Sequence, residues 1–218
     1  MITVVIPTLN AAATLGPCLD SVREADEIVV VDGGSTDATA ALTRSSGARL
    51  LRSARGRGVQ LAAGAAAAKG DWLLFLHADT RLAPGWREAA ERHGARRPGS
   101  AACFRFRLDA WERRARLVEA GVALRVRALG LPYGDQGLLL ARRLYDEAGG
   151  FRSLPLMEDV DLVRRIGAGR IEPLEVDALT SAERWRSGGW FRRSALNLLC
   201  LACYRCGMSP GRVARLYG

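Results

Sequence analysis

The chain has 218 residues, of which 49% are apolar and 25% charged, so it can bury a core and is not a disordered segment. No apolar run approaches the roughly 20 residues that a membrane-spanning helix needs. The net charge of +9 would suit a nucleic acid, an anionic membrane or a nucleotide substrate. However, the arginines are spread along the chain, which favours codon bias as the origin of the charge. No aromatic–basic recognition motif is present, so we expect no nucleic-acid partner.

The first 80 residues alternate between strand-like and helix-like segments. Short apolar or β-branched runs predict strands at 2–6, 27–31, 48–51 and 72–76. Helical spacing predicts helices at 11–24, directly after residue 37, and at 56–69. This alternation implies right-handed crossovers between parallel strands, and therefore an α/β fold.

Beyond residue 80 the pattern is less regular. It predicts helices at 84–96, 111–129 and 189–217, the last with a break near 207–210. Strands are predicted at 101–108, where apolar and polar residues alternate as in a half-exposed strand, at 137–141 and at 171–176. Because proline cannot donate a hydrogen bond to a neighbouring strand, Pro173 predicts a sheet edge for the last strand.

The first residues and the cysteines favour a cytoplasmic protein. The segment from Ile2 lacks the basic start and small-residue cleavage site of a secretory signal. Five cysteines are an odd number, which argues against a disulfide framework. Cys200, Cys203 and Cys206 match the start of an iron–sulfur pattern, but no fourth ligand follows, and a stripe on an apolar helix is the favoured interpretation.

The loop 32–37, Asp-Gly-Gly-Ser-Thr-Asp, follows the second predicted strand. A carboxylate at a strand end, followed by glycines and hydroxyls, can hold a ribose or a base by hydrogen bonds. The same residues can also start a helix, with Ser35 or Thr36 as the cap and Asp37 at the positive helix end. The residues alone leave both interpretations open.

His77 and Asp79 follow the apolar strand at 72–76. Because ligands of parallel α/β sheets bind beyond the carboxyl ends of the strands, this pair is a candidate metal site. Carboxylates suit hard divalent ions, and imidazole suits Mn better than Mg. Two ligands cannot enclose a metal, so diphosphate oxygens and water would have to complete the site. A capped turn with a structural histidine is the alternative.

A third polar cluster consists of Glu158, Asp159 and Asp161. Neighbouring negative charges raise the pKa of a carboxylate and so its strength as a general base. The alternative is the first turn of a helix, where carboxylates gain from the helix dipole. The turn at 149–151 and Pro155 form an irregular loop just before the cluster, which favours a functional role.

The order of these motifs resembles the family 2 glycosyltransferases over nearly the whole chain. The resemblance rests on residues 5–10, 31–37, 75–79, 149–151 and 158–162. Within the family, the chain is most similar to the subgroup called radical-SAM/selenodomain-associated transferase 2. The resemblance implies an A-type nucleotide-sugar transferase fold, with a mostly parallel central sheet flanked by helices and with C-terminal helices. It implies one domain over 1–218, divided into a nucleotide-sugar-binding half (1–100), an acceptor and catalytic half (101–180) and a helical segment (181–218).

The resemblance also implies roles for individual residues. Those that would hold the donor nucleotide and its diphosphate are Pro7, Thr8, Asp32 and Arg184. A divalent cation, Mn or Mg, would bind the diphosphate at the motif that is reduced here to His77 and Asp79. Asp159 would deprotonate the acceptor, and in-line attack would invert the anomeric centre. The residues of the acceptor side would be Asp135, Gln136 and Glu158.

Two positions depart from the family pattern. Gly33 stands where the family has the second of two adjacent aspartates, so one expected contact to the nucleotide is missing. His77 stands where the first aspartate of the metal motif is usual, which favours Mn, or coordination by Asp79 alone. These departures leave the nucleotide base and the metal open.

Other functions compete with transfer from a nucleotide-diphosphate sugar to a small-molecule or lipid acceptor. A nucleotidyltransferase on a similar fold would need a Gly-rich, basic phosphate loop after the first strand, which residues 8–11 lack. A degenerate, non-catalytic nucleotide-sugar-binding protein is suggested by Gly33 and His77. The stretches 111–129 and 189–206 could make a peripheral membrane contact and meet a lipid acceptor, although core packing with a solvated arginine face is favoured.

Overall fold

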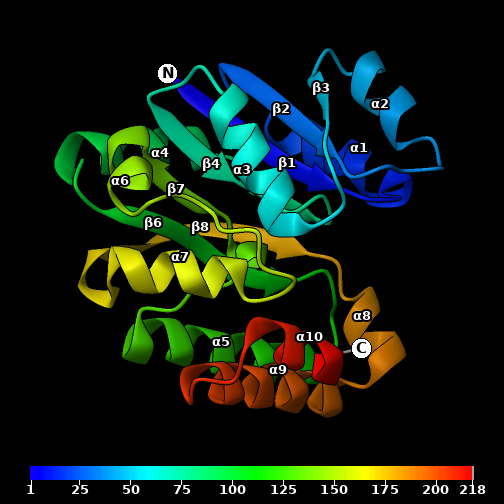
Figure 1. The fold of residues 1–218 in the computed structure, drawn as a ribbon, viewed down its shortest axis with the longest axis vertical. Helices are drawn as coiled ribbons and strands as arrows, with labels where there is room; N and C mark the ends of the chain where they lie inside the picture. The colour runs from blue at the N-terminus through cyan, green and yellow to red at the C-terminus, as the bar shows by residue number, and fades with distance from the viewer. Residues whose placement is uncertain (218) are drawn as a thin grey trace.

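The computed structural model describes residues 1–217 (Figure 1). In this part of the chain an eight-stranded mixed sheet has the order β3-β2-β1-β4-β7-β6-β8-β5. The strands are β1 (Ile2–Thr8), β2 (Glu27–Asp32), β3 (Arg49–Arg52), β4 (Trp72–Phe75), β5 (Thr80–Leu82), β6 (Ala101–Leu108), β7 (Leu138–Ala141) and β8 (Ile171–Thr180). The helices are α1 (Ala12–Ser21), α2 (Thr39–Ser45), α3 (Arg57–Ala67), α4 (Trp86–Arg96), α5 (Arg113–Leu129), α6 (Arg142–Glu147), α7 (Glu158–Ile166), α8 (Glu183–Gly188), α9 (Trp190–Arg205) and α10 (Pro210–Tyr217).

The four N-terminal strands confirm the predicted parallel arrangement. β3, β2, β1 and β4 are parallel neighbours. Helices cover both faces of β1, so that Val5 packs in an apolar cluster with α3, whereas Val4 and Ile6 pack in another with α1. A Cβ at Gly64 would lie 2.3 Å from a methyl carbon of Val5, so glycine is what allows α3 to approach the sheet this closely. Burial on both faces explains the continuous apolar runs of these strands.

The sheet changes direction after β4. β7 is antiparallel to β4 and to β6, and β6 is parallel to β8. The short β5 is antiparallel to the end of β8. Neither β5 nor α6 is predicted from the sequence, because three-residue and six-residue elements carry too little periodicity. The whole sheet is therefore mixed, and its parallel half is N-terminal.

The last strand, β8, is longer than the predicted segment at 171–176. It continues to Thr180 because residues 178–180 pair with β6 on one side and with β5 on the other. Pro173 lies opposite Cys103 of β6, and among residues 1–217 no strand pairs with it on the other side. The predicted edge position is confirmed for the first half of the strand.

Helices α5, α9 and α10 lie side by side beyond α7 (Figure 1). An apolar cluster joins α5, α8 and α9 to β6 through Phe106, Leu108, Ala115, Trp185 and Trp190. The predicted break near 207–210 is confirmed, since α9 ends at Arg205 and α10 begins at Pro210. Over residues 1–217, none of the helices combines the length and the apolar composition that crossing a bilayer requires.

Candidate active site

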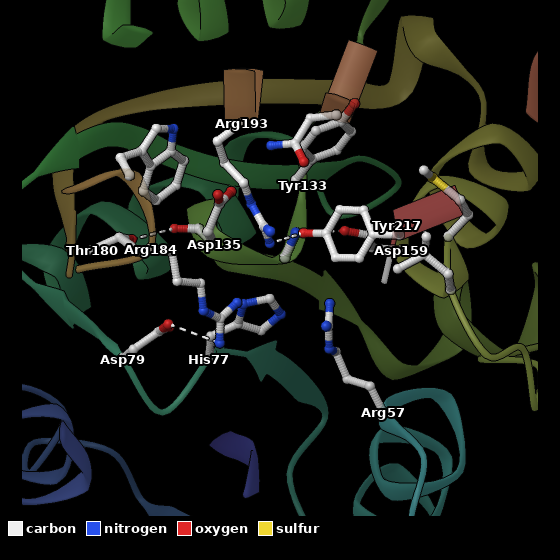
Figure 2. Close-up of a pocket in the computed structure, with 15 residues that line it drawn as sticks. Arg57, His77, Asp79, Tyr133, Asp135, Asp159, Thr180, Arg184, Arg193 and Tyr217 are labelled. Carbon is white, nitrogen blue, oxygen red and sulfur yellow. Dashed lines mark hydrogen bonds and ion pairs between the residues drawn. The ribbon is translucent and has the colours of Figure 1, made fainter. Parts of the chain in front are cut away.

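A cavity of about 80 Å³ lies at the carboxyl edge of β4, with walls from the loop before β5, α3, α7 and the C-terminal helices (Figure 2). Its charged lining contains three arginines and three aspartates: Arg57, Arg184, Arg193, Asp79, Asp135 and Asp159. His77, Tyr133 and Tyr217 are also part of its wall. Of the residues singled out from the sequence, the structure therefore brings five together here: His77, Asp79, Asp135, Asp159 and Arg184.

Asp79 and Arg184 face each other across the cavity. Their nearest carboxylate oxygen and guanidinium nitrogen are 3.5 Å apart. The pairing of β5 with β8 holds the two segments together, because the hydroxyls of Thr80 and Thr180 are 2.9 Å apart and the backbone N–H of Ser181 donates to the carbonyl of Asp79. Strand β8, which lies about a hundred residues after β4 in the sequence, thus positions Arg184 at the end of β4.

Gly134 separates His77 from Asp159. Its N–H donates to Asp159 Oδ2 at 2.8 Å, and a Cβ at this position would lie 2.3 Å from His77 Nε2. Burial, together with the positive charges of Arg57 and Arg184, holds the pKa of His77 well below its usual value of 6.5. The imidazole is therefore neutral at physiological pH and packs against a backbone that only glycine fits.

The loop before α7 positions Asp159. Gly149 and Gly150 have φ values of 75° and 61°, and Met157, directly before the helix, has φ of 67°. A non-glycine residue with a positive φ, such as Met157, stores backbone strain, which often occurs at functional sites. Phe151 anchors the loop, with its ring centroid 4.8 Å from that of Phe75 in β4. Asp159, the second residue of α7, is thereby held at the cavity.

Asp135 lies in the single-turn 3₁₀ helix Gly134–Gln136. Its Oδ1 atom is buried and has no hydrogen-bond partner within residues 1–217. Burial raises the pKa of Asp135 to about 6, although Arg125 opposes the shift, and the charges of Asp159 and Asp79 add to it. The folded protein therefore keeps this group protonated up to a higher pH than the unfolded chain does.

We expect Asp135→Asn to raise the free energy of unfolding by about 3 kcal/mol at pH 8, since the pKa of Asp135 rises from 3.8 to about 6 and one pKa unit corresponds to about 1.4 kcal/mol. The folded-state pKa lies above the ordinary value of 3.8, so the wild type loses stability as the pH rises from about 4 to about 6, and this loss persists at higher pH. The variant lacks this titration. Urea unfolding at pH 8 and pH 4 measures the effect, and a stability gap of the same size at both pH values would contradict it.

Glu158 lies beneath the cavity. Its side chain is 2% exposed, and Oε1 is 3.1 Å from the guanidinium of Arg57. Burial raises the pKa of Glu158, Arg57 opposes this shift, and Asp159 adds to it. The sequence-based prediction puts Glu158 on the acceptor side, whereas the structure puts it against the first residue of α3, outside the lining of the main cavity.

Gln136 is buried and holds the 3₁₀ turn in place. Its amide nitrogen donates to the carbonyl of Phe104 at 3.2 Å, and its amide oxygen accepts from Arg125 at 3.3 Å. Like Glu158, it lies outside the lining of the main cavity. The structure therefore gives Gln136 structural contacts, while its neighbour Asp135 reaches the cavity.

Pro7, Thr8 and Asp32 lie at the ends of β1 and β2, next to the cavity but outside its lining. The Thr8 hydroxyl donates to the carbonyl of Val31 at 3.3 Å. Asp32 is 2% exposed and accepts hydrogen bonds from the backbone N–H and the hydroxyl of Ser35. These strand-end residues thus form a second, closed region of the same sheet edge.

The loop 32–37 also starts helices, as one of its two interpretations predicts. The residue responsible is Asp37, which accepts hydrogen bonds from the N–H groups of Ala12 and Thr39, each at 3.0 Å. Ser35 donates to Asp32 instead of capping α2. At Gly33 a Cβ would lie 3.1 Å from the amide of Gln60, so the missing aspartate leaves room for this buried side chain.

The cavity residues that were not predicted from the sequence include Arg57, Tyr133, Arg193 and Tyr217. Arg193 donates a hydrogen bond to the hydroxyl of Tyr217, and its guanidinium lies 4.5 Å from the centroid of that ring (Figure 2). Arg57 had a weak local signal in its flanking glycines. Tyr133, Arg193 and Tyr217 have none, because the 3₁₀ turn brings Tyr133 to the cavity and the packing of α9 and α10 brings the other two.

A parallel half-sheet that leads carboxylates and an arginine to a cavity at its carboxyl edge is typical of nucleotide-binding α/β enzymes. The fold is that of the A-type nucleotide-sugar transferases. It is similar to glucosyl-3-phosphoglycerate synthase from Mycobacterium tuberculosis in complex with Mn²⁺ and UDP-glucose, with a TM-score of 0.66 over 95% of this chain and 79% of that chain, at 22% identity. Mannosyl-3-phosphoglycerate synthase from Rubrobacter xylanophilus is also similar, with a TM-score of 0.62 over 95% of this chain and 75% of that one, at 18% identity.

The chain belongs to glycosyl transferase family 2, whose family model matches residues 3–144. It is 41% identical over 99 residues to a PGL/p-HBAD biosynthesis glycosyltransferase of Mycobacterium tuberculosis, which covers 38% of this chain and 36% of that relative. It is 35% identical over 92 residues to the M. tuberculosis glucosyl-3-phosphoglycerate synthase, covering 36% of this chain and 28% of that one. The match thus spans about a third of each relative. The predictions of an A-type fold and of a family 2 glycosyltransferase are confirmed.

Proposed function

We propose that the cavity catalyses metal-assisted, inverting transfer of a sugar from a nucleotide diphosphate to an acceptor hydroxyl. The observation that carries the proposal is the convergence on one cavity of Asp79 from the loop after β4, Arg184 from α8 and Asp159 from α7. The relatives add support, since solved complexes of glucosyl-3-phosphoglycerate synthase contain UDP, Mn²⁺ and UDP-glucose. A non-catalytic sugar-nucleotide binder is the alternative that the experiments below test.

The proposed step needs a base on one side of the sugar and, on the opposite side, a positive charge that stabilises the leaving diphosphate. The acceptor oxygen forms a bond to the anomeric carbon as its proton passes to the Asp159 carboxylate. The bond from that carbon to the diphosphate oxygen breaks, and the diphosphate leaves with the electron pair. Arg184 stabilises the charge that develops on the leaving group. Displacement from the opposite face inverts the anomeric centre.

The donor nucleoside is proposed to lie at the ends of β1 and β2. Pro7, Thr8 and Asp32 line that part of the sheet edge, and the diphosphate would extend from there toward Asp79. Breaking the hydrogen bonds of Asp32 with Ser35 would free this carboxylate for a ribose or base. This arrangement corresponds to a donor half at 1–100, an acceptor half at 101–180 and a helical wall at 181–218 within one domain.

A divalent cation is proposed as the cofactor, with Asp79 as its protein ligand. The fit is supported by the Asp79 carboxylate, which faces the cavity and has only the guanidinium of Arg184, at 3.5 Å, as an ion-pair partner in residues 1–217. His77 has the neutral form that a ligand needs, but its Nε2 packs against Gly134, so it fits less well. When bound, such a cation neutralises charge on the diphosphate. Membership of the radical-SAM/selenodomain-associated transferase 2 subgroup is also a proposal. It rests on the sequence motifs alone, because the relatives reported above carry other names.

Calorimetric titration with UDP-glucose, with and without Mn²⁺, tests the donor site. We expect Mn²⁺ to tighten binding to the wild type, and Asp79→Asn to remove about tenfold or more of this gain, because a charge-assisted contact contributes about 1.5–3 kcal/mol. The control is Asp71→Asn at the opposite end of β4, where the side chain is 86% exposed. Equal loss in both variants contradicts the role of Asp79, and metal-independent binding without turnover supports the binder.

A further inference from the structure

A second cavity of about 180 Å³ lies between α5 and α9. Leu117, Gly121 and Val122 form its α5 wall, and Phe191 and Leu198 form its α9 wall. We call it the α5–α9 groove. Its walls are mainly aliphatic and aromatic, whereas the main cavity is lined by charges.

The α5–α9 groove adjoins the main cavity and shares part of its lining. Tyr133, Asp135, Trp185 and Asn197 line both spaces. Three buried polar atoms at this junction have no hydrogen-bond partner within residues 1–217: the Tyr133 hydroxyl, Asp135 Oδ1 and Trp185 Nε1. Buried polar groups are normally paired, so a cluster of unpaired ones indicates where the polar group of a ligand binds.

The outer part of the groove exposes large apolar side chains. Leu117 and Phe191 are each 61% exposed, and Leu198 is 57% exposed. Apolar side chains gathered on one surface indicate a binding site, whereas isolated ones need no explanation. The groove thus joins an apolar surface to a polar end beside Asp159.

Gly121 lies in the middle of the 17-residue helix α5. Glycine there costs about 1 kcal/mol relative to alanine, and its φ is not positive, so the backbone does not require it. A Cβ at this position meets no atom within 4 Å and would project into the groove. Gly121 therefore weakens the helix but keeps the groove open, as expected if the groove binds a ligand.

We propose that the α5–α9 groove binds the apolar chain of the acceptor, so that the acceptor is an amphiphile with its reactive hydroxyl at the junction. This inference rests on the proposed function and specifies its acceptor class. The unpaired atoms at the junction match a hydroxyl group, and the apolar walls match a hydrocarbon chain. A flat bilayer surface would meet only the exposed rim, whereas a single chain can follow a narrow groove down to Asp135.

The probe is the series 1-hexanol, 1-octanol and 1-decanol, measured by displacement of N-phenyl-1-naphthylamine fluorescence. We expect affinity to rise about fourfold for each added methylene, which is the value for burial of one CH₂ group. Gly121→Phe fills the groove and should flatten this dependence and weaken 1-decanol binding at least tenfold. Ala120→Phe, on the same helix but outside the groove lining, should bind as the wild type does.

Further measurements separate the alternatives. Leu198→Gln changes the opposite wall and should weaken 1-decanol in the same direction, which covers the case that Gly121→Phe does not fold. Affinity without chain-length dependence, or equal losses in Gly121→Phe and Ala120→Phe, would overturn the inference. A third outcome would also overturn it: Gly121→Phe still co-sediments with anionic vesicles but no longer binds 1-decanol. The apolar surface would then bind a bilayer and not a single chain. Titration of the wild type with UDP-glucose and Mn²⁺ reports on the donor site alone, so its failure would instead count against the proposed function.

Discussion

Asp159→Asn is expected to lower the transfer rate about a thousandfold and to leave donor affinity within about twofold. Proton transfer by a positioned base contributes about 10²- to 10⁴-fold to an enzymatic rate. Asparagine keeps the size of the side chain and an oxygen that accepts the N–H of Gly134, which Asp159 Oδ2 binds at 2.8 Å. It cannot take up the acceptor proton. The variant therefore separates chemistry from binding.

The measurement is nucleoside diphosphate release from the nucleotide sugar that gives the largest thermal shift, with water as the acceptor so that no further ligand is needed. Asp146→Asn, an exposed residue of α6, is the matched control and should keep the wild-type rate. Turnover at the wild-type rate in Asp159→Asn would remove this carboxylate from the mechanism. A large loss of donor affinity would instead show that Asp159 acts in binding.

Arg57→Met is expected to lower the free energy of unfolding by about 3 kcal/mol at pH 7.5. The Glu158 side chain, 2% exposed, loses the guanidinium that lies 3.1 Å from it. Removing one partner of a buried ion pair typically costs about 3–5 kcal/mol, and the lower end applies because Arg57 is partly exposed. Burial already raises the pKa of Glu158, and loss of Arg57 raises it further. Protonation at lower pH should therefore relieve the penalty.

Urea unfolding at pH 7.5 and pH 5 tests this prediction. The loss should be clearly smaller at pH 5, and Arg57→Met with Glu158→Met should recover most of the stability at pH 7.5. Arg143→Met, which removes an exposed pair with Glu147 within one helix, is the control and should change stability by less than about 0.5 kcal/mol. A loss that is independent of pH would place the effect in packing and not in the charge of Glu158.

The carboxyl edge of the parallel strands could be predicted because its signals are local. An apolar run followed by His77 and Asp79 indicates both the strand and the edge at which it ends, and parallel strands bring such ends together. The same reasoning places Asp32 at the edge. It does not show that Asp32 is turned toward Ser35, because that depends on side-chain hydrogen bonds within a loop that two interpretations fitted equally well.

The rest of the site depends on partners that are distant in the chain. Tyr133 reaches the cavity through the 3₁₀ turn, and Arg193 and Tyr217 reach it because α9 packs with both α5 and α10. Around Arg193 and Tyr217, neither the residue types nor their spacing differ from those of an ordinary amphipathic helix. Glu158 illustrates the opposite case, since the sequence marks it as an acceptor-side residue, whereas the structure shows its buried pair with Arg57, which the sequence does not predict. Local patterns predict elements and their ends, whereas tertiary packing decides which side chains share a cavity.

The pairing of β5 with β8 has a consequence for the order in which the protein is made. The hydroxyl pair that fastens the Asp79 loop joins residues 80 and 180. Ribosomes add about 5–20 residues per second. β4 therefore leaves the exit tunnel about 5–20 s before β8 does. The Asp79 loop therefore cannot make its contact with Thr180 until a hundred further residues have been synthesised.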